Sequence, residues 1–254
     1  MSQPDDVGAT EVAVGGWAAD TAGWWQREFT DGVDPEYTEQ IIPIIVSQLA
    51  DRGRILDVGT GEGQVARALR AEGADVVGID PIDSMVREAS RRDEAMPLAR
   101  AGADALPFVD ASFDAALACL VFEHIDEVDE AITEVARVVR PGGTFLFLLN
   151  HPLLQTPDSG WIDDQIVEPP EQYWRIGPYL VEQATIEEVQ KGVFIRFIHR
   201  PLSRYINALA ANGLVLSQMI EPPPPPGFLE KTNAFEAAAA IPRLLVLACK
   251  KATR

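Results

Sequence analysis

The stretch ILDVGTGEG, residues 55–63, decides the fold of this chain. Its first half is a continuous apolar run typical of a buried strand, and its second half is a glycine-rich turn that leads into a helix over 62–70. Gly59 and Gly61 permit positive φ angles and a close approach of the backbone to a ligand. A ligand bound at this turn would lie against the helix N-terminus, where backbone N–H groups have no partner within the helix.

Strands and helices alternate outward from this turn to about residue 150. The predicted strands cover 54–58, 74–80, 112–120 and 144–149, and apolar residues at helical spacing lie between them. This alternation is typical of a parallel sheet with crossover helices. The sequence therefore predicts a doubly wound α/β domain.

The segments that flank this pattern are less regular. Before it, Asp34 is a predicted N-cap, Pro35 the first helical position, and Pro43 the site of a kink. After it, a stretch rich in Pro, Trp, Tyr and acidic residues continues to Tyr179, which is too long for an ordinary loop. The remaining predicted elements are a hairpin of 180–188 and 192–198 around Lys191 and Gly192, a helix over 201–211, a strand over 214–220, a stiff polyproline spacer, a short helix in AFEAAAAI and a last strand over 243–250.

The charge of the chain excludes one large class of partner. Lys and Arg number 21 against 39 Asp and Glu, a net charge of −18, so the chain would repel a nucleic-acid backbone. Cys119 and Cys249 lie far apart in apolar runs and are expected to be buried thiols. The first residues lack the pattern of a signal peptide, and no apolar run approaches the roughly 20 residues of a membrane helix. We therefore expect a soluble cytoplasmic protein without a membrane partner.

An acidic residue at the end of the second predicted strand indicates the kind of ligand. Asp80 follows Gly59 by 21 positions. Its carboxylate can accept both hydrogen bonds of a ribose diol, each contributing roughly 1.5–3 kcal/mol. The glycines fall at 59, 61 and 63, with Gln64 where the dinucleotide pattern has its third glycine, and this spacing disfavours NAD. A nucleoside cofactor other than NAD is predicted.

The segment DVGTGEG resembles motif I of the class I S-adenosylmethionine-dependent methyltransferases. The resemblance extends over roughly residues 36–150 through VVGID, ALPF at 105–108, SFDAALACLVFEHI at 112–125 and VVRPGGTFLF at 138–147, in the order of that family. It implies a Rossmann-like sheet of seven strands whose last strand, RLLVLACK, is antiparallel. It also implies S-adenosylmethionine as the cofactor and methyl transfer as the reaction.

Carried over residue by residue, the resemblance implies a set of cofactor-binding positions. Asp57 and the turn from Gly59 to Gly61 are expected to face the methionine moiety, Asp80 the ribose, and Met85 the adenine. The usual adenine-side acid of the family is replaced by Gly102, so the backbone of Ala103 or the side chain of Asp104 is expected to substitute for it. The complete predicted set is Asp57, Gly59, Thr60, Gly61, Asp80, Pro81, Met85, Ala103, Asp104, Cys119 and Leu120.

The acceptor side is predicted from position alone. His151 directly follows the fifth strand, so it is a candidate general base, and His124 is the second candidate. The alternative is that Asn150, His151 and Pro152 only form a turn out of the sheet. Glu123, Asn150 and Tyr179 are the predicted substrate contacts. Trp24, Trp25 and Phe29 form either a lid over the cofactor or a packing staple.

The strand ends carry no set of hard oxygen ligands, and the cysteines and histidines lack zinc-ligand spacing, so no metal is expected. We expect residues 1–34 to cover the cofactor, 35–150 to form the binding core, 151–200 to form an acceptor lid or a homodimer contact, and 201–254 to complete the core. The predicted function is metal-independent transfer of a methyl group to a small organic acceptor. The alternatives are a non-catalytic S-adenosylmethionine-binding or regulatory module and, disfavoured by the glycine spacing, an NAD-type oxidoreductase.

Overall fold

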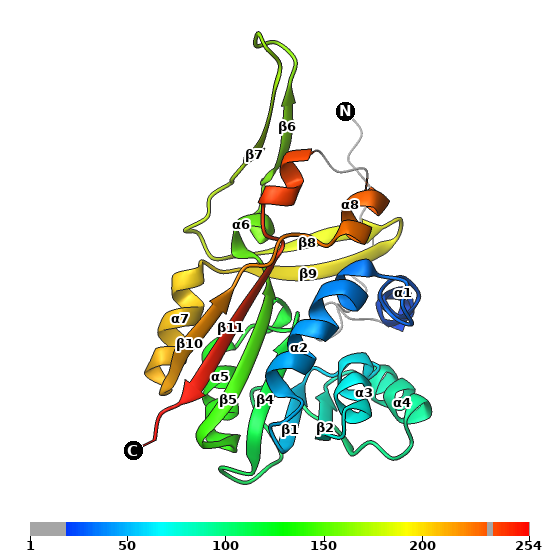
Figure 1. The fold of residues 1–254 in the computed structure, drawn as a ribbon, viewed down its shortest axis with the longest axis vertical. Helices are drawn as coiled ribbons and strands as arrows, with labels where there is room; N and C mark the ends of the chain where they lie inside the picture. Colours follow the sequence, from blue (N-terminus) through cyan, green and yellow to red (C-terminus); the bar gives the residue numbers. More distant parts are fainter. Residues whose placement is uncertain (1–18, 233–235, 254) are drawn as a thin grey trace, which may run out of the picture.

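A seven-stranded sheet forms the centre of the molecule (Figure 1). The computed structural model describes residues 19–232 and 236–253. The strand order is β10-β11-β5-β4-β1-β2-β3, and β11 runs antiparallel to both of its neighbours while the other pairs are parallel. The strands are β1 (Arg54–Val58), β2 (Asp75–Asp80), β3 (Leu98–Arg100), β4 (Phe113–Cys119), β5 (Val139–Asn150), β10 (Leu214–Ile220) and β11 (Leu244–Lys251).

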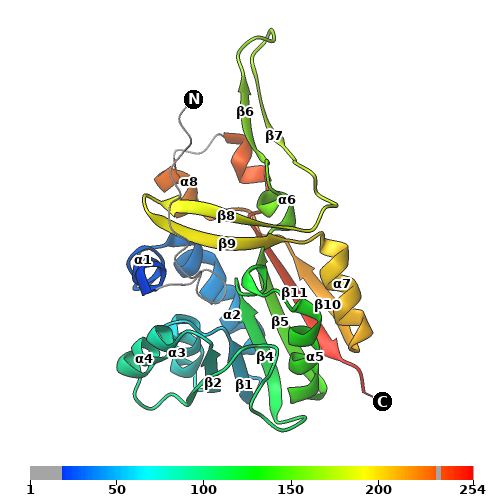
Figure 2. The same cartoon turned by 180° about the vertical axis from the view of Figure 1, so that it is seen from behind.

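Helices cover both faces of this sheet, as the opposite views in Figures 1 and 2 show. Side chains of a strand alternate between its two faces, so Ile55 packs into one core and Leu56 into the other. The first core includes buried residues of α2 (Ile42–Leu49), α3 (Gln64–Ala71) and α4 (Asp83–Arg92). The second includes residues of α5 (Val128–Val138) and α7 (Leu202–Ala211). The predicted doubly wound sheet with an antiparallel last strand is therefore confirmed.

The short strand β3 was not predicted, because three residues are too few to show a periodic pattern. Both cysteines are free thiols, as expected, and Cys249 is fully buried while Cys119 is half-buried. No helix of the described ranges is long and apolar enough to span a bilayer.

The helical segment before β1 is irregular where Pro43 predicts a kink. A wider π-helical turn, η2 (Glu36–Ile41), precedes α2. Pro43 has no N–H to donate to the carbonyl four residues earlier, which is a physical reason for a change of helix type next to it. The N-cap of η2 is Pro35 rather than the predicted Asp34, although Asp34 Oδ1 accepts the Glu36 N–H at 3.1 Å.

The segment after β5 contains two hairpins. The predicted hairpin is confirmed as β8 (Gln183–Gln190) and β9 (Val193–His199), and it lies across the carboxyl ends of the parallel strands (Figures 1 and 2). A second, unpredicted hairpin follows the short helix α6 (Pro152–Gln155) and projects away from the body. Its strands are β6 (Gly160–Asp164) and β7 (Glu171–Arg175).

Two expectations near the C-terminus need correction. The polyproline run is not a spacer to its end, because Pro226 begins the helix α8 (Pro226–Thr232). A proline fits the first turn of a helix, where its missing N–H would have no partner. The AFEAAAAI helix is a 3-10 helix, η4 (Glu236–Ala240), and Ala234 and Phe235 lie outside the described residues. The remaining helical elements are α1 (Ala19–Phe29) and η3 (Phe122–His124).

Candidate functional site

A pocket of about 450 Å³ lies at the carboxyl ends of β1, β2 and β4. Open α/β sheets bind ligands at this edge, and the volume lies within the usual range for small-molecule sites. All eleven predicted cofactor-binding residues line it. The wall is completed by residues that the sequence did not single out for binding, among them Tyr37, Glu62, Gln64, Ile82, Val121, Ile125, Asp126 and Glu127.

The two glycines of the turn serve different purposes. Gly59 has φ +71°, and a Cβ there would lie 2.5 Å from Val121 Cγ2. Glycine is thus required at 59 by the packing of the loop after β4. Gly61 has φ +56°, and a Cβ there would meet nothing within 4 Å. Its backbone faces open pocket, which is what a closely approaching ligand needs.

Asp80 fixes the opposite wall of the pocket. Its carboxylate is buried, with Oδ2 accepting the Gly61 N–H at 3.0 Å and Oδ1 accepting the Ile82 N–H at 2.8 Å. Burial raises the pKa of this carboxyl to about 6, although both backbone hydrogen bonds favour the charged form. A carboxylate has about four acceptor positions, so the side chain can still receive hydrogen bonds from a diol.

Asp57 lies on the floor of the same pocket. Its Oδ2 accepts the Thr60 hydroxyl at 2.7 Å. Burial, together with the neighbouring acids Asp80 and Glu62, raises the pKa of Asp57 to about 7. Glu62 is compensated by ion pairs to two arginines, at 2.7 Å to Arg67 and 3.4 Å to Arg92.

Asp104 lies beside the position where an adenine-side acid was expected. A Cβ at Gly102 would overlap Asp104 Oδ1, so the carboxylate fills the space that a larger residue at 102 would occupy. Ala103, which lies between these two residues in the sequence, is buried, and all three residues line the pocket. Asp104 therefore lies against Gly102 on the pocket wall, and its role in place of the missing acid stays a prediction.

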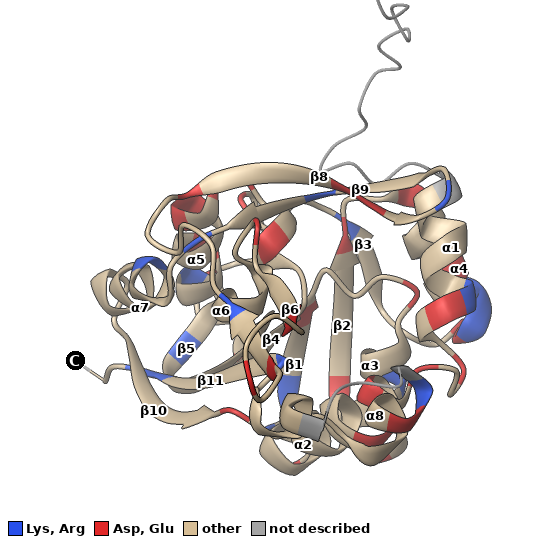
Figure 3. Ribbon diagram, turned by 90° about the horizontal axis from the view of Figure 1, so that it is seen from above, with Lys and Arg blue, Asp and Glu red and all other residues tan. Residues whose placement is uncertain are grey.

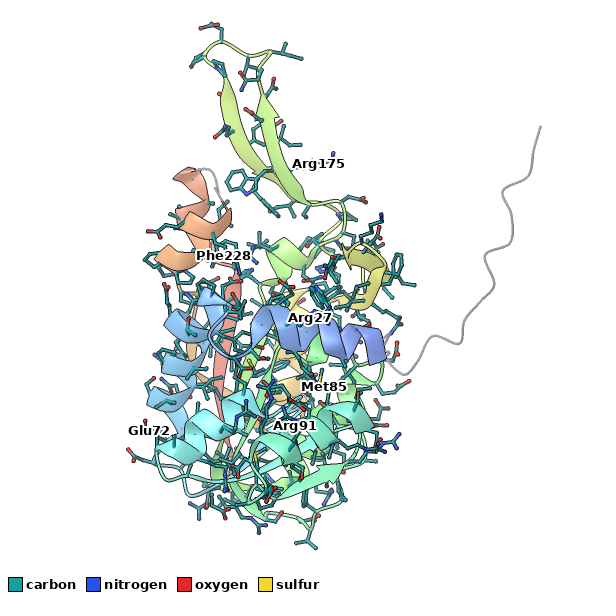
Figure 4. The ribbon with its side chains drawn as sticks, turned by 90° about the vertical axis from the view of Figure 1, so that its right-hand side faces the viewer. Arg27, Glu72, Met85, Arg91, Arg175 and Phe228 are labelled. Atoms are coloured by element: carbon teal, nitrogen blue, oxygen red, sulfur yellow. The ribbon has the colours of Figure 1, made fainter. Side chains whose placement is uncertain are left out.

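The helix α1 closes one side of the pocket through Trp25. The Trp25 ring stacks on Phe29 with centroids 4.5 Å apart and meets the edge of Tyr37 at 6.1 Å. Gln26 Nε2 lies 3.8 Å from Met85 Sδ, and Figure 4 shows Met85 just below α1. Trp24 is buried but does not line this pocket. Trp25 thus lines the pocket and Trp24 packs outside it, and a lid role over the cofactor stays a prediction.

Of the two histidines predicted to be catalytic, only His124 lines the pocket. Its Nδ1 lies 2.9 Å from the Arg196 carbonyl and must carry a proton to donate to it. Burial lowers the pKa of His124 to about 4, so the ring is neutral at physiological pH.

The predicted role of His151 does not fit the structure. His151 is buried outside the pocket wall, and both of its ring nitrogens are occupied. Nε2 lies 2.9 Å from Glu221 Oε1, and Nδ1 accepts the Leu153 N–H at 3.2 Å, which caps α6. The geometry instead matches the alternative of a turn out of the sheet.

The three predicted substrate contacts also lie off the pocket wall. Glu123 Oε1 accepts the backbone N–H of Asn150 at 2.9 Å and its side-chain amide at 3.0 Å, and burial raises the Glu123 pKa to about 7. Tyr179 accepts the Leu202 N–H at 2.9 Å through its hydroxyl. These residues join the loops to the core. The described part of the chain holds no group of three or more side chains able to bind a metal ion.

Comparison with known proteins gives this geometry a context. Residues 56–147 match a family model described as a methyltransferase domain. The chain is 34% identical over 110 residues to the malonyl-[acyl-carrier protein] O-methyltransferase of Pseudescherichia vulneris, covering 42% of this chain and 44% of that protein. It is 42% identical over 128 residues to the demethylmenaquinone methyltransferase of Thermus thermophilus, covering 48% and 57%. The matched region thus spans about half the length of these curated relatives.

A solved structure extends the similarity to nearly the whole chain. An S-adenosylmethionine-dependent methyltransferase from Mesorhizobium loti is 27% identical and matches with a TM-score of 0.70, covering 87% of this chain and 99% of that one. Residues 56–147 thus match a methyltransferase domain, and the fold of the chain is similar to that of an S-adenosylmethionine-dependent methyltransferase over most of its length. S-adenosylmethionine is the cofactor that this similarity supports.

The residues of this methyltransferase domain fit that cofactor. The open space above Gly61 and the anchored carboxylate of Asp80 suit a nucleoside with an attached amino acid. Sequence reasoning missed Tyr37, whose side chain is buried and lines the pocket together with Cys119. Tyr37 lies 20 positions before Asp57 in a helical segment, and no local pattern relates it to the site.

Proposed function

We propose that this protein transfers the methyl group of S-adenosylmethionine to a small organic acceptor without a metal ion. The observation that carries the proposal is the convergence of all eleven expected cofactor positions on one pocket, with the Gly61 backbone facing open space. Bound S-adenosylmethionine supplies an activated sulfonium methyl group. The protein therefore has to supply mainly positioning, which is worth roughly 7–11 kcal/mol in well-oriented reactions.

The roles of the chain's own residues follow from the pocket. Asp80 and Asp104 would hold the nucleoside, and Asp57 with the turn at Gly59–Gly61 would hold the methionine part. Trp25 and the hydroxyl of Tyr37 exclude water from the covered side. His124 replaces His151 as the candidate general base, because His124 lines the pocket and His151 does not.

The size and charge of the site favour a small acceptor over a nucleic acid. The exposed residues on the pocket wall include the acids Asp104, Asp126 and Glu127, which would repel a phosphate backbone. We further propose that residues 151–200 shield the acceptor, since β8–β9 lies across the carboxyl ends of the strands (Figure 1). A homodimer contact through the same segment stays a prediction.

The proposal is tested by calorimetry with S-adenosylhomocysteine and by methyl transfer from labelled S-adenosylmethionine to an acceptor panel. We expect micromolar or tighter binding and transfer to at least one small acceptor. Binding without transfer to any acceptor would favour the non-catalytic module. NAD binding in place of S-adenosylhomocysteine would contradict the cofactor assignment.

A further inference from the structure

The β6–β7 hairpin, residues 160–175, projects away from the body of the molecule (Figures 1 and 2). In the described part of the chain neither of its strands pairs with a third strand. A two-stranded hairpin is only marginally stable in water, and it gains stability when a further strand or surface covers it. A projecting hairpin of this kind therefore suits contact with another molecule.

The same hairpin exposes large apolar side chains. Ile166 at its tip is 96% exposed, and Tyr173 on β7 is 45% exposed. Val167 at the tip and Ile176 directly after β7 are exposed as well. Single exposed apolar side chains are common on protein surfaces, but several of them on one projecting element mark an interaction surface.

One face of the hairpin carries opposite charges at its two ends. Residues opposite one another in an antiparallel pair share a face, and successive residues of a strand alternate between faces. The face that contains Tyr173, called here the Tyr173 face, carries three such pairs from base to tip. They are Gly160 with Arg175, Ile162 with Tyr173, and Asp164 with Glu171. A cation thus lies at the base, apolar side chains in the middle, and two acids towards the tip.

These charged groups do not satisfy one another within one copy of the chain. Arg175, labelled on the hairpin in Figure 4, and Glu171 are both exposed, and their side chains form no ion pair or hydrogen bond with a described residue. They lie four residues apart on β7, which is about 13 Å along a strand and too far for a direct ion pair. Both ends of the Tyr173 face are therefore available to a partner.

We propose that a second copy of this chain is the partner, and that the two copies associate through their Tyr173 faces about a two-fold axis. When the axis passes between the two Tyr173 side chains, the base of one hairpin lies over the tip side of the other. Arg175 then lies opposite Glu171 of the partner subunit, and the reverse pair forms at the other end. Ile162 and Tyr173 cover their counterparts between the two ion pairs. A face with opposite charges at its two ends is complementary to its own reversed copy.

The size of this face favours a weak dimer. A strand of five residues is about 17 Å long and the two strands are about 10 Å across, so the face covers less than the roughly 800 Å² per partner of a standard interface. The net charge of −18 on each copy also opposes association. We expect a dissociation constant of about 10–100 μM.

Charge reversals on the full chain test this contact by analytical ultracentrifugation from 1 μM to 1 mM protein. Arg175→Glu and Glu171→Arg should each weaken dimerisation by at least about 10-fold, because like charges then meet at both ends. An equimolar mixture of these two variants should associate with nearly the affinity of the unmodified chain, because every opposed pair in the mixed dimer again joins unlike charges. The double variant Glu171→Arg/Arg175→Glu should dimerise by itself for the same reason.

Asp163→Arg is the matched control, because it changes the charge of the hairpin by the same amount on the opposite face and should leave the dimer in place. The inference is overturned if the unmodified chain stays monomeric at 1 mM, if either single reversal dimerises as well as the unmodified chain, or if the mixed variants do not associate. It is also overturned if Asp163→Arg weakens the dimer as much as Glu171→Arg does. No cofactor enters these measurements, so the contact can fail while the proposed methyl transfer holds.

Discussion

Gly59, Gly61 and Gly73 all have positive φ angles, and only their surroundings differ. A left-handed backbone costs an alanine roughly 1–2 kcal/mol at any of the three positions. At Gly59 the added Cβ would also collide with Val121, and at Gly61 it would enter the open pocket. Gly73 does not line the pocket, and an added Cβ there would meet no atom within 4 Å. Alanine substitutions at these positions therefore report three effects separately. Gly73→Ala reports backbone strain alone, Gly59→Ala adds a packing clash, and Gly61→Ala adds a clash with a bound ligand.

We therefore expect Gly61→Ala to weaken S-adenosylhomocysteine binding by at least about 10-fold, with a small loss of stability. Gly73→Ala should show the same small loss of stability but normal affinity for S-adenosylhomocysteine, because it introduces the same backbone strain away from the pocket. Gly59→Ala should unfold at clearly lower temperature than either. Calorimetric titration and thermal unfolding of the three variants check this, and normal affinity in Gly61→Ala would contradict the assignment of the turn to the cofactor.

Asp80 makes cofactor binding depend on pH. Its raised pKa of about 6 means that part of the apo population is protonated below pH 7, and the charged form is the better acceptor for a diol. Affinity for S-adenosylhomocysteine should thus rise as the pH increases from 5 to 7 and level off above. Asp80→Asn should lower the affinity at pH 8 by about 10- to 100-fold and flatten this profile. An unchanged profile in the variant would assign the pH dependence to another group.

At the scale of elements, α1 connects the cofactor pocket with an aromatic cluster. Trp25 and Trp24 are neighbours in this helix, with ring centroids 6.4 Å apart, yet only Trp25 lines the pocket. Both contact Phe29, at 4.5 Å for Trp25 and 5.1 Å for Trp24. Packing and covering are thus divided between two adjacent residues.

This division predicts different effects for two alanine substitutions. Trp25→Ala should weaken S-adenosylhomocysteine binding by about 3- to 10-fold, because it opens one side of the pocket. Trp24→Ala should mainly destabilise the fold, in line with the roughly 3–5 kcal/mol typical of a buried Trp→Ala change. Titration at a temperature where both variants are folded distinguishes the two effects. Equal losses of affinity would show that the whole helix acts as one packing unit.

At the scale of the whole molecule, three buried acids determine how stability varies with pH. Burial raises the pKa of Asp57 and Glu123 to about 7 and that of Asp80 to about 6. Between about pH 4 and pH 7 the native state therefore holds more protons than the unfolded state, so the free energy of unfolding falls as the pH rises. Below this window the lowered pKa of Glu88, about 2 because of its bonds to Arg91 and Arg92, acts in the opposite direction.

The apo protein is accordingly expected to be most stable near pH 4 and to lose roughly 5–10 °C in Tm by pH 8. Glu123→Gln should reduce this loss without touching the pocket wall, since the amide carries no charge to bury. Thermal unfolding in a buffer series without ligand measures the effect. A Tm that rises from pH 5 to pH 8 would show that these carboxylates are charged in the native state.

The acidic surface is a property of the whole chain as well. Figure 3 shows Asp and Glu distributed over many elements, with fewer Lys and Arg segments. This agrees with the net charge of −18 that the composition gives. Charge of this sign and size is a matter of composition, so no tertiary information is needed to obtain it.

The sequence by itself determined the doubly wound sheet, because the alternation of strands and helices depends on local signals. The antiparallel last strand and the expected cofactor positions came from the resemblance of its motifs to a known family. Apolar runs, the glycine turn and Asp80 at a strand end act over a few residues, and the order of the motifs along the chain carries the rest. The acceptor side depends on contacts between distant segments. His124 rather than His151 faces the pocket, and Tyr37 reaches Cys119 from a helix 82 positions earlier in the chain. Only the packing of α1, η3 and the β8–β9 hairpin over the strand ends decides such contacts, since no local pattern records which side chains of separate elements meet.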